Sequence, residues 1–186
     1  MKKLITILLL SILTITVNAQ TSLETAVLKE LNTYRAKNHL CTLKIDNALS
    51  TWSNYHARYL TKLNTMGKVD RSHDEKIDIS DWKELSFEQR AIEFNKADDN
   101  NHINGEVQTR SIPFEPGTPE KDIAKRIIEG FDNSQLHQEI IKSKYDTASD
   151  LPIVGISVIK NHDQIGGYDV YTVVIDLGVK FDYVKK

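Results

Sequence analysis

The amino-acid sequence predicts an α+β fold, an α-β-α sandwich in which helices cover both faces of a small central antiparallel sheet. Three observations support this prediction. Capped amphipathic helical patterns recur through the larger, N-terminal part of the chain. Two β-branched runs near its end have the pattern of a hairpin, and the second run is apolar on both faces. A strand of that kind lies inside a sheet, with helices on each side.

The first helix is predicted from a capping box and an apolar stripe. Thr21 can cap the helix while the side chain of Glu24 reaches back to the Thr21 backbone. We expect an amphipathic helix from this cap to about Lys37. Its apolar face is formed by residues at helical spacing, namely Leu23, Val27, Leu31 and Tyr34.

A second and stronger helical pattern follows a short extended link at 40–43. Asp46 is its expected N-cap and Gly67 its C-terminal stop. His56 lies on the apolar stripe of this helix, so we expect a core residue whose hydrogen bonds are satisfied. The other members of the stripe are Leu49, Trp52, Tyr59, Leu60 and Leu63.

The middle of the chain has weaker patterns. Residues 67–81 are rich in charges, and His73 lies among them. A capping box formed by Ser86 and Gln89 predicts a short helix through Phe94. The acidic run at 98–101 lacks the alternating ligand spacing of a calcium loop, so we expect a solvated loop there that leads into 102–107.

A loop with three prolines precedes another helix, which Thr118 and Pro119 open. Ile123, Ile127 and Phe131 lie on one face of that helix. At 131–141 an Asn-Ser break follows, because Asn and Ser compete with the backbone for hydrogen bonds and favour caps. We expect Ser134 to open a further helix with His137 on its first turn, where a histidine is well placed to face a cleft.

Residues 153–159 and 168–177 form the predicted antiparallel hairpin, because both runs are rich in β-branched residues. Turn residues at 161–163 and a Gly-Gly pair at 166–167 separate them. In the second run, apolar side chains point to both sides of the sheet. Tyr171, Val173 and Ile175 face one side and Val170, Thr172 and Val174 the other. We therefore expect this strand to be central.

Residues 1–19 have the features of a secretory signal peptide. Lys2 and Lys3 precede an apolar run, and Val17, Asn18 and Ala19 provide a site of small residues for signal peptidase. The apolar run is too short for a stable membrane span. We expect cleavage before Gln20, a single domain at 20–186, and a periplasmic or extracellular location without a transmembrane segment in the mature chain.

Composition narrows the class of protein further. The formal net charge of −2 becomes −4 when two lysines leave with the signal peptide, and no clustered basic face suggests nucleic-acid binding. Cys41 is the single cysteine, which excludes an intramolecular disulfide. It also lies far from the cleavage site, so a lipid-anchored cysteine is not expected. We expect a monomer.

The order of these segments resembles the CAP superfamily, named for cysteine-rich secretory proteins, antigen 5 and pathogenesis-related one proteins, in its bacterial branch. The family's Asn-x-Tyr-Arg signature matches 32–35 in the first helix, within Leu-Asn-Thr-Tyr-Arg at 31–35. The family's second helix carries a leucine, a small residue and His-Ala. Leu49, Ser53 and the His-Ala pair at 56–57 have that spacing.

Further motifs follow in the family's order. His73 stands where a histidine follows the second helix, and Gly-Glu-Val at 105–107 resembles the Gly-Glu-Asn signature. Residues 131–137 are similar to the bacterial segment Trp-Met-Asn-Ser-Pro-Gly-His, with Phe131 in place of Trp. The strand at 154–158 and the strand containing Tyr171 also fit. The resemblance covers nearly all of the mature chain.

This resemblance implies a three-stranded antiparallel sheet and a central cleft. In many family members the cleft holds two histidines and two glutamates, sometimes around a divalent metal. His73, Glu106 and His137 carry over, whereas Ser134 stands where eukaryotic members have the second glutamate. These four residues are the predicted cleft residues. It stays open whether another carboxylate, such as Glu129, replaces the missing one.

Two functions follow as hypotheses. The first is a non-enzymatic exported protein that binds a small, lipid-like ligand or a partner through the cleft, in the cell envelope or outside the cell. The second is a divalent-metal-dependent hydrolase, because His73, Glu106 and His137 could bind Zn²⁺ with an open fourth position. Without the family pattern, His73 would be a solvated residue. A serine or cysteine nucleophile is disfavoured, since neither a nucleophile elbow nor a reactive-cysteine pattern occurs.

Overall fold

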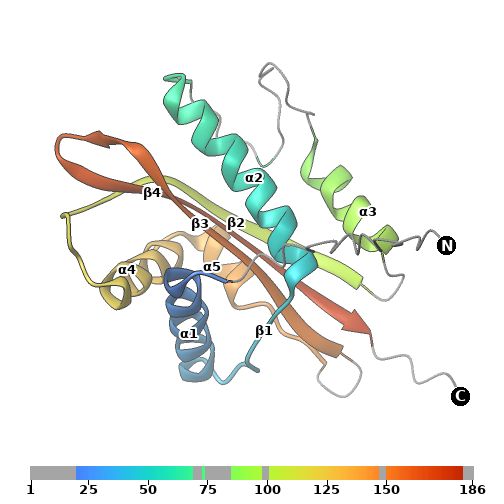
Figure 1. Cartoon of the computed structure of the whole chain (residues 1–186). Coiled ribbons are helices and arrows are strands. Elements are labelled where there is room, and N and C mark those ends of the chain that lie inside the picture. The colour runs from blue at the N-terminus through green and yellow to red at the C-terminus, as the bar shows by residue number, and fades with distance from the viewer. Residues whose placement is uncertain (1–19, 69–72, 74–84, 98–100, 147–149, 182–186) are drawn as a thin grey trace, which may run out of the picture.

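A computed structural model describes residues 20–68, 73, 85–97, 101–146 and 150–181 (Figure 1). The predicted signal peptide, most of the charged stretch at 67–81 and the loop at 98–100 lie outside these residues. The elements in chain order are α1 (Ser22–Lys37), β1 (Lys44–Ile45), α2 (Asn47–Thr65), α3 (Phe87–Ala97), β2 (Asn101–Phe114), α4 (Glu120–Asp132), α5 (Gln135–Ile141), β3 (Asp150–Ile165) and β4 (Tyr168–Phe181).

The sheet has four strands in the order β1-β3-β4-β2. The hairpin of β3 and β4 forms as predicted, and β2 pairs antiparallel with β4 on its other side. The expectation of a purely antiparallel, three-stranded sheet was wrong, because the short β1 pairs parallel with β3. The link between α1 and α2 runs beside β3 there, and Asp46 N donates to Val154 O at 2.9 Å. The sheet is therefore mixed.

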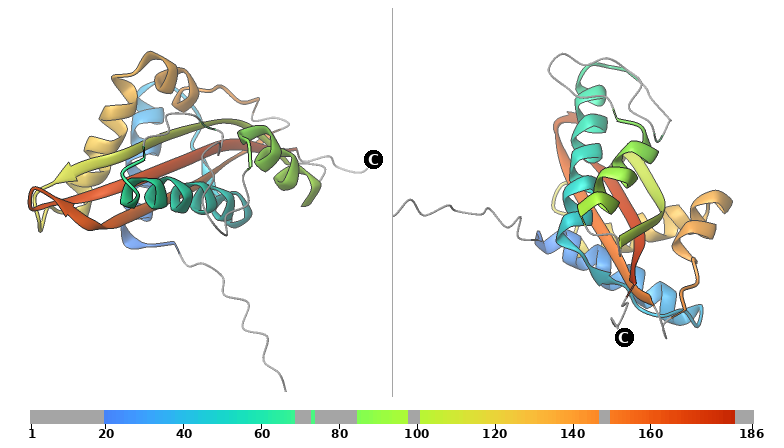
Figure 2. Two further views of the ribbon diagram at one scale, coloured as in Figure 1. Left: turned by 90° about the horizontal axis from the view of Figure 1, so that it is seen from above. Right: turned by 90° about the vertical axis from the view of Figure 1, so that its right-hand side faces the viewer.

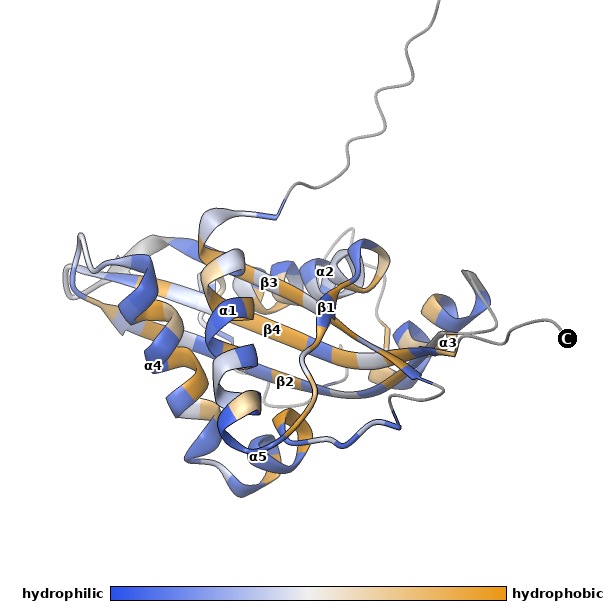
Figure 3. Ribbon diagram, turned by 90° about the horizontal axis from the view of Figure 1, so that it is seen from below, coloured by the Kyte–Doolittle hydropathy of each residue, from blue (hydrophilic) through white to orange (hydrophobic). Residues whose placement is uncertain are grey.

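Helices cover both faces of this sheet. Helices α1, α4 and α5 lie on one face and α2 and α3 on the other (Figure 2). Figure 3 shows β3 and β4 largely hydrophobic beside α1. Strand β4 is central as predicted, and apolar residues of its two faces enter different core clusters. Tyr171, Val173, Ile175 and Leu177 pack with α1 and α4, and Val174 packs with α2.

The predicted starts of α1, α2 and α3 are confirmed, whereas Pro119 rather than Thr118 occupies the N-cap position of α4. Thr21 and Glu24 form both bonds of the capping box, and Asp46 caps α2 through Leu49 N. Ser86 and Gln89 exchange the same pair of bonds before α3, which continues to Ala97, beyond the predicted end. None of the helices in the described ranges has the length and apolar character needed to cross a membrane.

The break between α4 and α5 forms at the predicted place, with Ser134 in the N-cap position. Its backbone is extended, as a cap requires. The expected side-chain cap is wrong, because in the described structure the Ser134 side chain accepts no capping hydrogen bond. His137 is the third residue of α5, on its first turn as predicted.

Strand β2 was not predicted. Its register shifts between Ile103 and Gly105 and again between Thr109 and Ile112, so each bulge reverses which side chains face which side. Ile103 packs beside α3, whereas Val107 packs on the opposite face. This change of parity hides the alternation that identifies a strand.

Gly155 sets how closely α2 approaches the sheet. A Cβ there would lie 2.5 Å from the carbonyl carbon of Leu49 and 2.6 Å from the hydroxyl oxygen of Ser53. Only a residue without a Cβ allows this contact between β3 and the α2 backbone. The contact brings Ser53 and, one turn further on, His56 against the strands.

Candidate functional site

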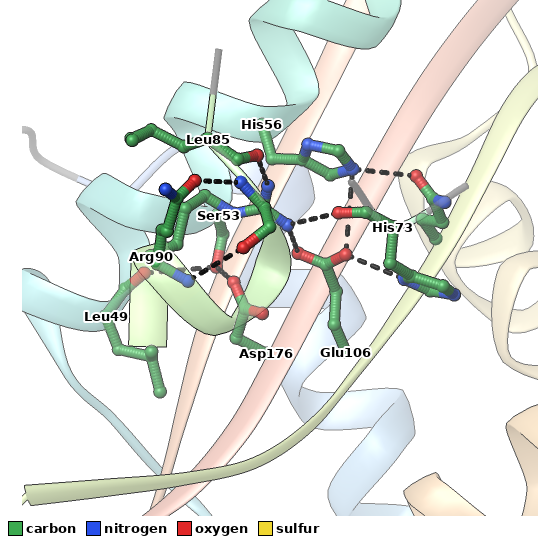
Figure 4. Close-up of polar contacts among 11 residues, drawn as sticks. Leu49, Ser53, His56, His73, Leu85, Arg90, Glu106 and Asp176 are labelled. Carbon is green, nitrogen blue, oxygen red and sulfur yellow. Dashed lines mark hydrogen bonds and ion pairs between the residues drawn. The ribbon is translucent and has the colours of Figure 1, made fainter. Parts of the chain in front are cut away.

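A buried polar cluster lies between β2, β4 and the helices α2 and α3 (Figure 4). Glu106 is its centre and is 3% exposed. Its Oε1 lies 2.8 Å from Nδ1 of His73, and its Oε2 accepts a hydrogen bond from Nη2 of Arg90 at 2.9 Å. Both carboxylate oxygens are thus engaged within the protein. We call the whole set the Glu106 cluster: Ser53, His56, His73, Arg90, Glu106 and Asp176.

Arg90 joins separate parts of the chain. Its side chain comes from α3 and is buried. Besides Glu106, Nη2 contacts the backbone carbonyl of His73 at 3.0 Å, and Nη1 donates to the carbonyl of Leu85 at 3.2 Å. Arg90 therefore holds both the carboxylate and the backbone of the histidine that the carboxylate binds. It is a positioning residue for His73.

His56 from α2 is fully buried. Its Nε2 lies 2.9 Å from Oε1 of Gln108 and 3.6 Å from Oε1 of Glu106. Because both neighbours are acceptors, a proton on Nε2 satisfies this nitrogen. The prediction of a core histidine with satisfied hydrogen bonds is confirmed. The structure adds that His56 also belongs to the charge environment of Glu106.

The neighbours of Glu106 keep it ionised. Burial raises the pKa of a carboxyl group. At Glu106 the charge of His56, the hydrogen bond from His73 and the charge of Arg90 outweigh burial and lower the pKa from 4.5 to about 2. Glu106 is therefore a carboxylate at neutral pH, and it only accepts hydrogen bonds.

Asp176 is a second buried acid in the cluster, and it behaves in the opposite way. It lies on the central strand β4 and accepts a hydrogen bond from Oγ of Ser53 at 2.6 Å. Burial, and then the nearby charge of Glu106, raise the pKa of Asp176 well above 3.8. The cluster thus favours one ionised and one protonated carboxyl group.

His73 connects the cluster to the protein surface. Its Nδ1 faces the Glu106 carboxylate and so carries a proton, which leaves Nε2 for a further partner. The side chain is 39% exposed. In this orientation Nε2 donates a hydrogen bond to a ligand when the ring is protonated and accepts one when the ring is neutral.

A surface groove runs along β2 beside the cluster. It consists of two cavities of about 460 Å³ and about 410 Å³, which share Gln108, Thr109 and His137. The first cavity lies between β2 and α4. The second includes His73 and the bulge at Arg110 and Ser111, where Ser111 has a φ of 57°. Such bulges and left-handed residues concentrate at functional sites.

His137 stands where the two cavities meet. Its ring packs edge to face against Phe131, with 5.3 Å between ring centres. Burial and then the neighbouring His73 lower the pKa of His137. The imidazole is therefore neutral at pH 7 and offers one donor and one acceptor.

The structure brings the four predicted cleft residues to one region, but their contacts with one another differ. His73 and Glu106 form a hydrogen bond, His73 and His137 share a cavity, and Ser134 lines the first cavity. Within the described ranges, no group of three or more His, Cys, Asp and Glu side chains is disposed to hold a metal ion. The predicted zinc ligands do not form such a group here, and Zn²⁺ binding stays a prediction. Glu129 also lines the first cavity.

Sequence reasoning did not single out Arg90 or Asp176 as site residues. Arg90 lies among Phe87, Ala91 and Phe94, which form the apolar face of α3. Asp176 interrupts the apolar run of a strand that is buried on both faces. The signal that could have identified both residues is a charge within an apolar helix face or strand. A buried charge of this kind must have a partner elsewhere in the fold.

Comparisons with known proteins give information about the fold only. No family model and no curated protein matches the chain. An outer surface protein from Borrelia burgdorferi has a similar solved structure, with a TM-score of 0.54 and 18% sequence identity, over 87% of this chain and 96% of that chain. Fold and site together define an α+β protein with a buried Glu-Arg-His cluster beside an open groove.

Proposed function

We propose that this chain is an exported, CAP-like protein that binds a small amphipathic acid, such as a fatty acid or a lipid with an anionic head, in the groove. The observation that carries the proposal is the mixed lining of two connected cavities. Cationic and imidazole groups occur beside apolar ones. A ligand with one charged end and one apolar part matches both.

The polar lining favours an anion. Arg126 lines the first cavity and Arg110 the second, and His73 and His137 add hydrogen-bonding groups. A guanidinium binds a carboxylate or phosphate with good geometry. Glu129 is the acidic residue of the first cavity, and Lys125 lies 3.7 Å from it.

The apolar lining accommodates a hydrocarbon part. Ile112, Ile127 and Phe131 line the first cavity, and Ile112 is partly exposed. A cavity of about 460 Å³ lies within the range of small-molecule sites. Burial of an alkyl chain there contributes about 0.8 kcal/mol for each buried CH₂ group.

The Glu106 cluster supports binding rather than catalysis. A general base must reach the proton that it removes. Glu106 is almost fully buried, and His73 and Arg90 occupy its two oxygens. Its role in the proposal is to fix the ring of His73 at the groove, so that Nε2 has a defined orientation.

Gly130 offers a direct test. It lines the first cavity, and a Cβ at this position would meet no atom within 4 Å. Gly130→Trp should place its indole ring in the cavity, and we expect the Kd for a fluorescent fatty acid to rise at least about tenfold, a loss of about 1.4 kcal/mol. Fluorescence titration measures this change.

Gly130→Ala is the matched control. Alanine adds only a methyl group and favours the helix, so binding should persist while the free energy of unfolding rises by up to about 1 kcal/mol. Equal affinities of the Trp and Ala variants, both folded by circular dichroism, would refute the groove as the binding site.

The metal-dependent hydrolase remains the second candidate, because His73 pairs with Glu106 and shares a cavity with His137. A zinc titration by calorimetry separates the two proposals. Ligand binding alone requires no zinc. Stoichiometric binding that disappears in both His73→Ala and His137→Ala would favour the hydrolase.

A further inference from the structure

A third, small cavity lies at the start of α1, away from the groove. Its volume is about 130 Å³, and it is lined by the beginning of α1, by polar residues of α2 and by Ile156 of β3. Gln20 extends into this region as the residue before the Thr21 cap. The polar residues from α2 are Asn47, Ser50 and Asn54.

The cavity lies next to β3, just beyond the residues of β3 that pair with β1. Ser50 Oγ accepts from the backbone of Ile156 at 3.4 Å, and Glu24 Oε1 accepts from the backbone of Val158 at 3.2 Å. Side chains thus satisfy strand amides here. The start of α1 is thereby tied to the sheet.

The side-chain amide of Gln20 is the unexplained group in this cavity. Its Nε2 is buried and has no hydrogen-bond partner among the residues that the structure describes. A buried N–H donor without a partner costs about 1–3 kcal/mol, so such a group calls for a physical reason.

We propose that Gln20 is a modification site, and that the mature chain begins with pyroglutamate seated in this cavity. The proposal uses the cleavage expected between Ala19 and Gln20, which gives Gln20 a free α-amino group. It is independent of ligand binding in the groove.

The reaction is an intramolecular aminolysis. The α-amino nitrogen of Gln20 attacks the side-chain carbonyl carbon Cδ and forms a new C–N bond. The bond between Cδ and Nε2 then breaks, and Nε2 leaves as ammonia with a proton from the amine. A five-membered lactam results, and no oxidant, reductant or other reactant is consumed.

The structure favours the product in two ways. The nitrogen that leaves is the buried one that lacks a partner. Cyclisation also replaces a positive ammonium by a neutral lactam directly before α1, where the positive end of the helix dipole repels a cation. The lactam keeps one N–H and one carbonyl group, which suit the amide and hydroxyl groups of Asn47, Ser50 and Asn54.

The test is the mass of the N-terminal peptide of the exported protein, produced from the full-length chain with its own leader. We expect a peptide that begins at residue 20, is lighter than the free glutamine form by one ammonia, and resists stepwise degradation from its N-terminus. Gln20→Asn is the matched control, because its amide could close only a strained four-membered ring, so it should keep a free amine and its full mass.

A second measurement tests the seating of the ring. Pyroglutamyl peptidase should release the residue from the isolated N-terminal peptide and at least about tenfold more slowly from the folded protein, because a docked terminus must first open. A free Gln20 amine, or a chain that begins at another residue, would overturn the modification. Equal release rates from peptide and folded protein would overturn the seating in the cavity.

Discussion

Glu106→Gln is expected to lower the free energy of unfolding at pH 7 by about 3–5 kcal/mol, whereas Asp176→Asn is expected not to lower it. Both substitutions convert a buried carboxyl group of the same cluster into an amide. The first removes the charge that balances Arg90 in the protein interior, at 2.9 Å from its guanidinium. The second removes an acid that the fold already holds toward its neutral form.

The pH dependence of the two variants should differ in sign. The lowered pKa of Glu106 contributes stability that is fully present above pH 4.5 and is lost as the pH falls toward about 2. The raised pKa of Asp176 acts in reverse, because the folded state keeps its proton longer than the unfolded state. Its contribution is present at acidic pH and is lost as the pH rises above 3.8.

Urea unfolding at a series of pH values measures both effects. The deficit of Glu106→Gln should shrink as the pH falls below 4.5, and Asp176→Asn should lack the loss of stability that the wild type shows on raising the pH. Equal losses for the two variants at pH 7 would contradict the assignment of one charged and one protonated acid.

Arg35→Met is expected to cost about 3–5 kcal/mol of folding free energy, because it leaves one buried and two partly buried carbonyl groups without a charged donor. Arg35 is fully buried. Its Nε donates to Cys41 O at 2.8 Å, Nη1 to Ile141 O at 2.8 Å and Nη2 to Ser143 O at 3.0 Å. The bonds to Ile141 and Ser143 join α1 to the end of α5, which carries His137.

Arg35→Lys is the control for this prediction. An ammonium keeps the charge but cannot reproduce the planar fork, so we expect an intermediate loss of about 2 kcal/mol. Hydrogen exchange should accelerate first in α5 of the Met variant, since its last turn loses the contact at Ile141. A Met variant as stable as the wild type would show that these bonds contribute little.

The helices and the hairpin could be predicted because local chemistry specifies them. Thr21 with Glu24 and Ser86 with Gln89 signal helix starts through their own hydrogen bonds, and these bonds form. Strand β2 could not be predicted, because two bulges reverse its pattern and its pairing with β4 is a long-range contact. The short β1 depends on its position beside β3 and has no signal of its own.

The site was predictable only in part, for a related reason. His73 and Glu106 were expected in one cleft on the strength of a family resemblance, and the structure joins them. Arg90 lies on the apolar face of α3, where the helical pattern alone predicts a hydrophobic residue. Its role follows from a partner on another element, which spacing along one helix does not reveal.

The most direct test of the proposed function is an NMR titration of the protein with dodecanoate. Binding in the groove predicts that amide resonances of residues lining it, such as Thr109, Gly130 and His137, shift together and saturate. Amides around the third cavity, such as that of Ser50, should stay unchanged. No shifts at saturating dodecanoate, or shifts confined to surfaces outside the groove, would contradict the proposal.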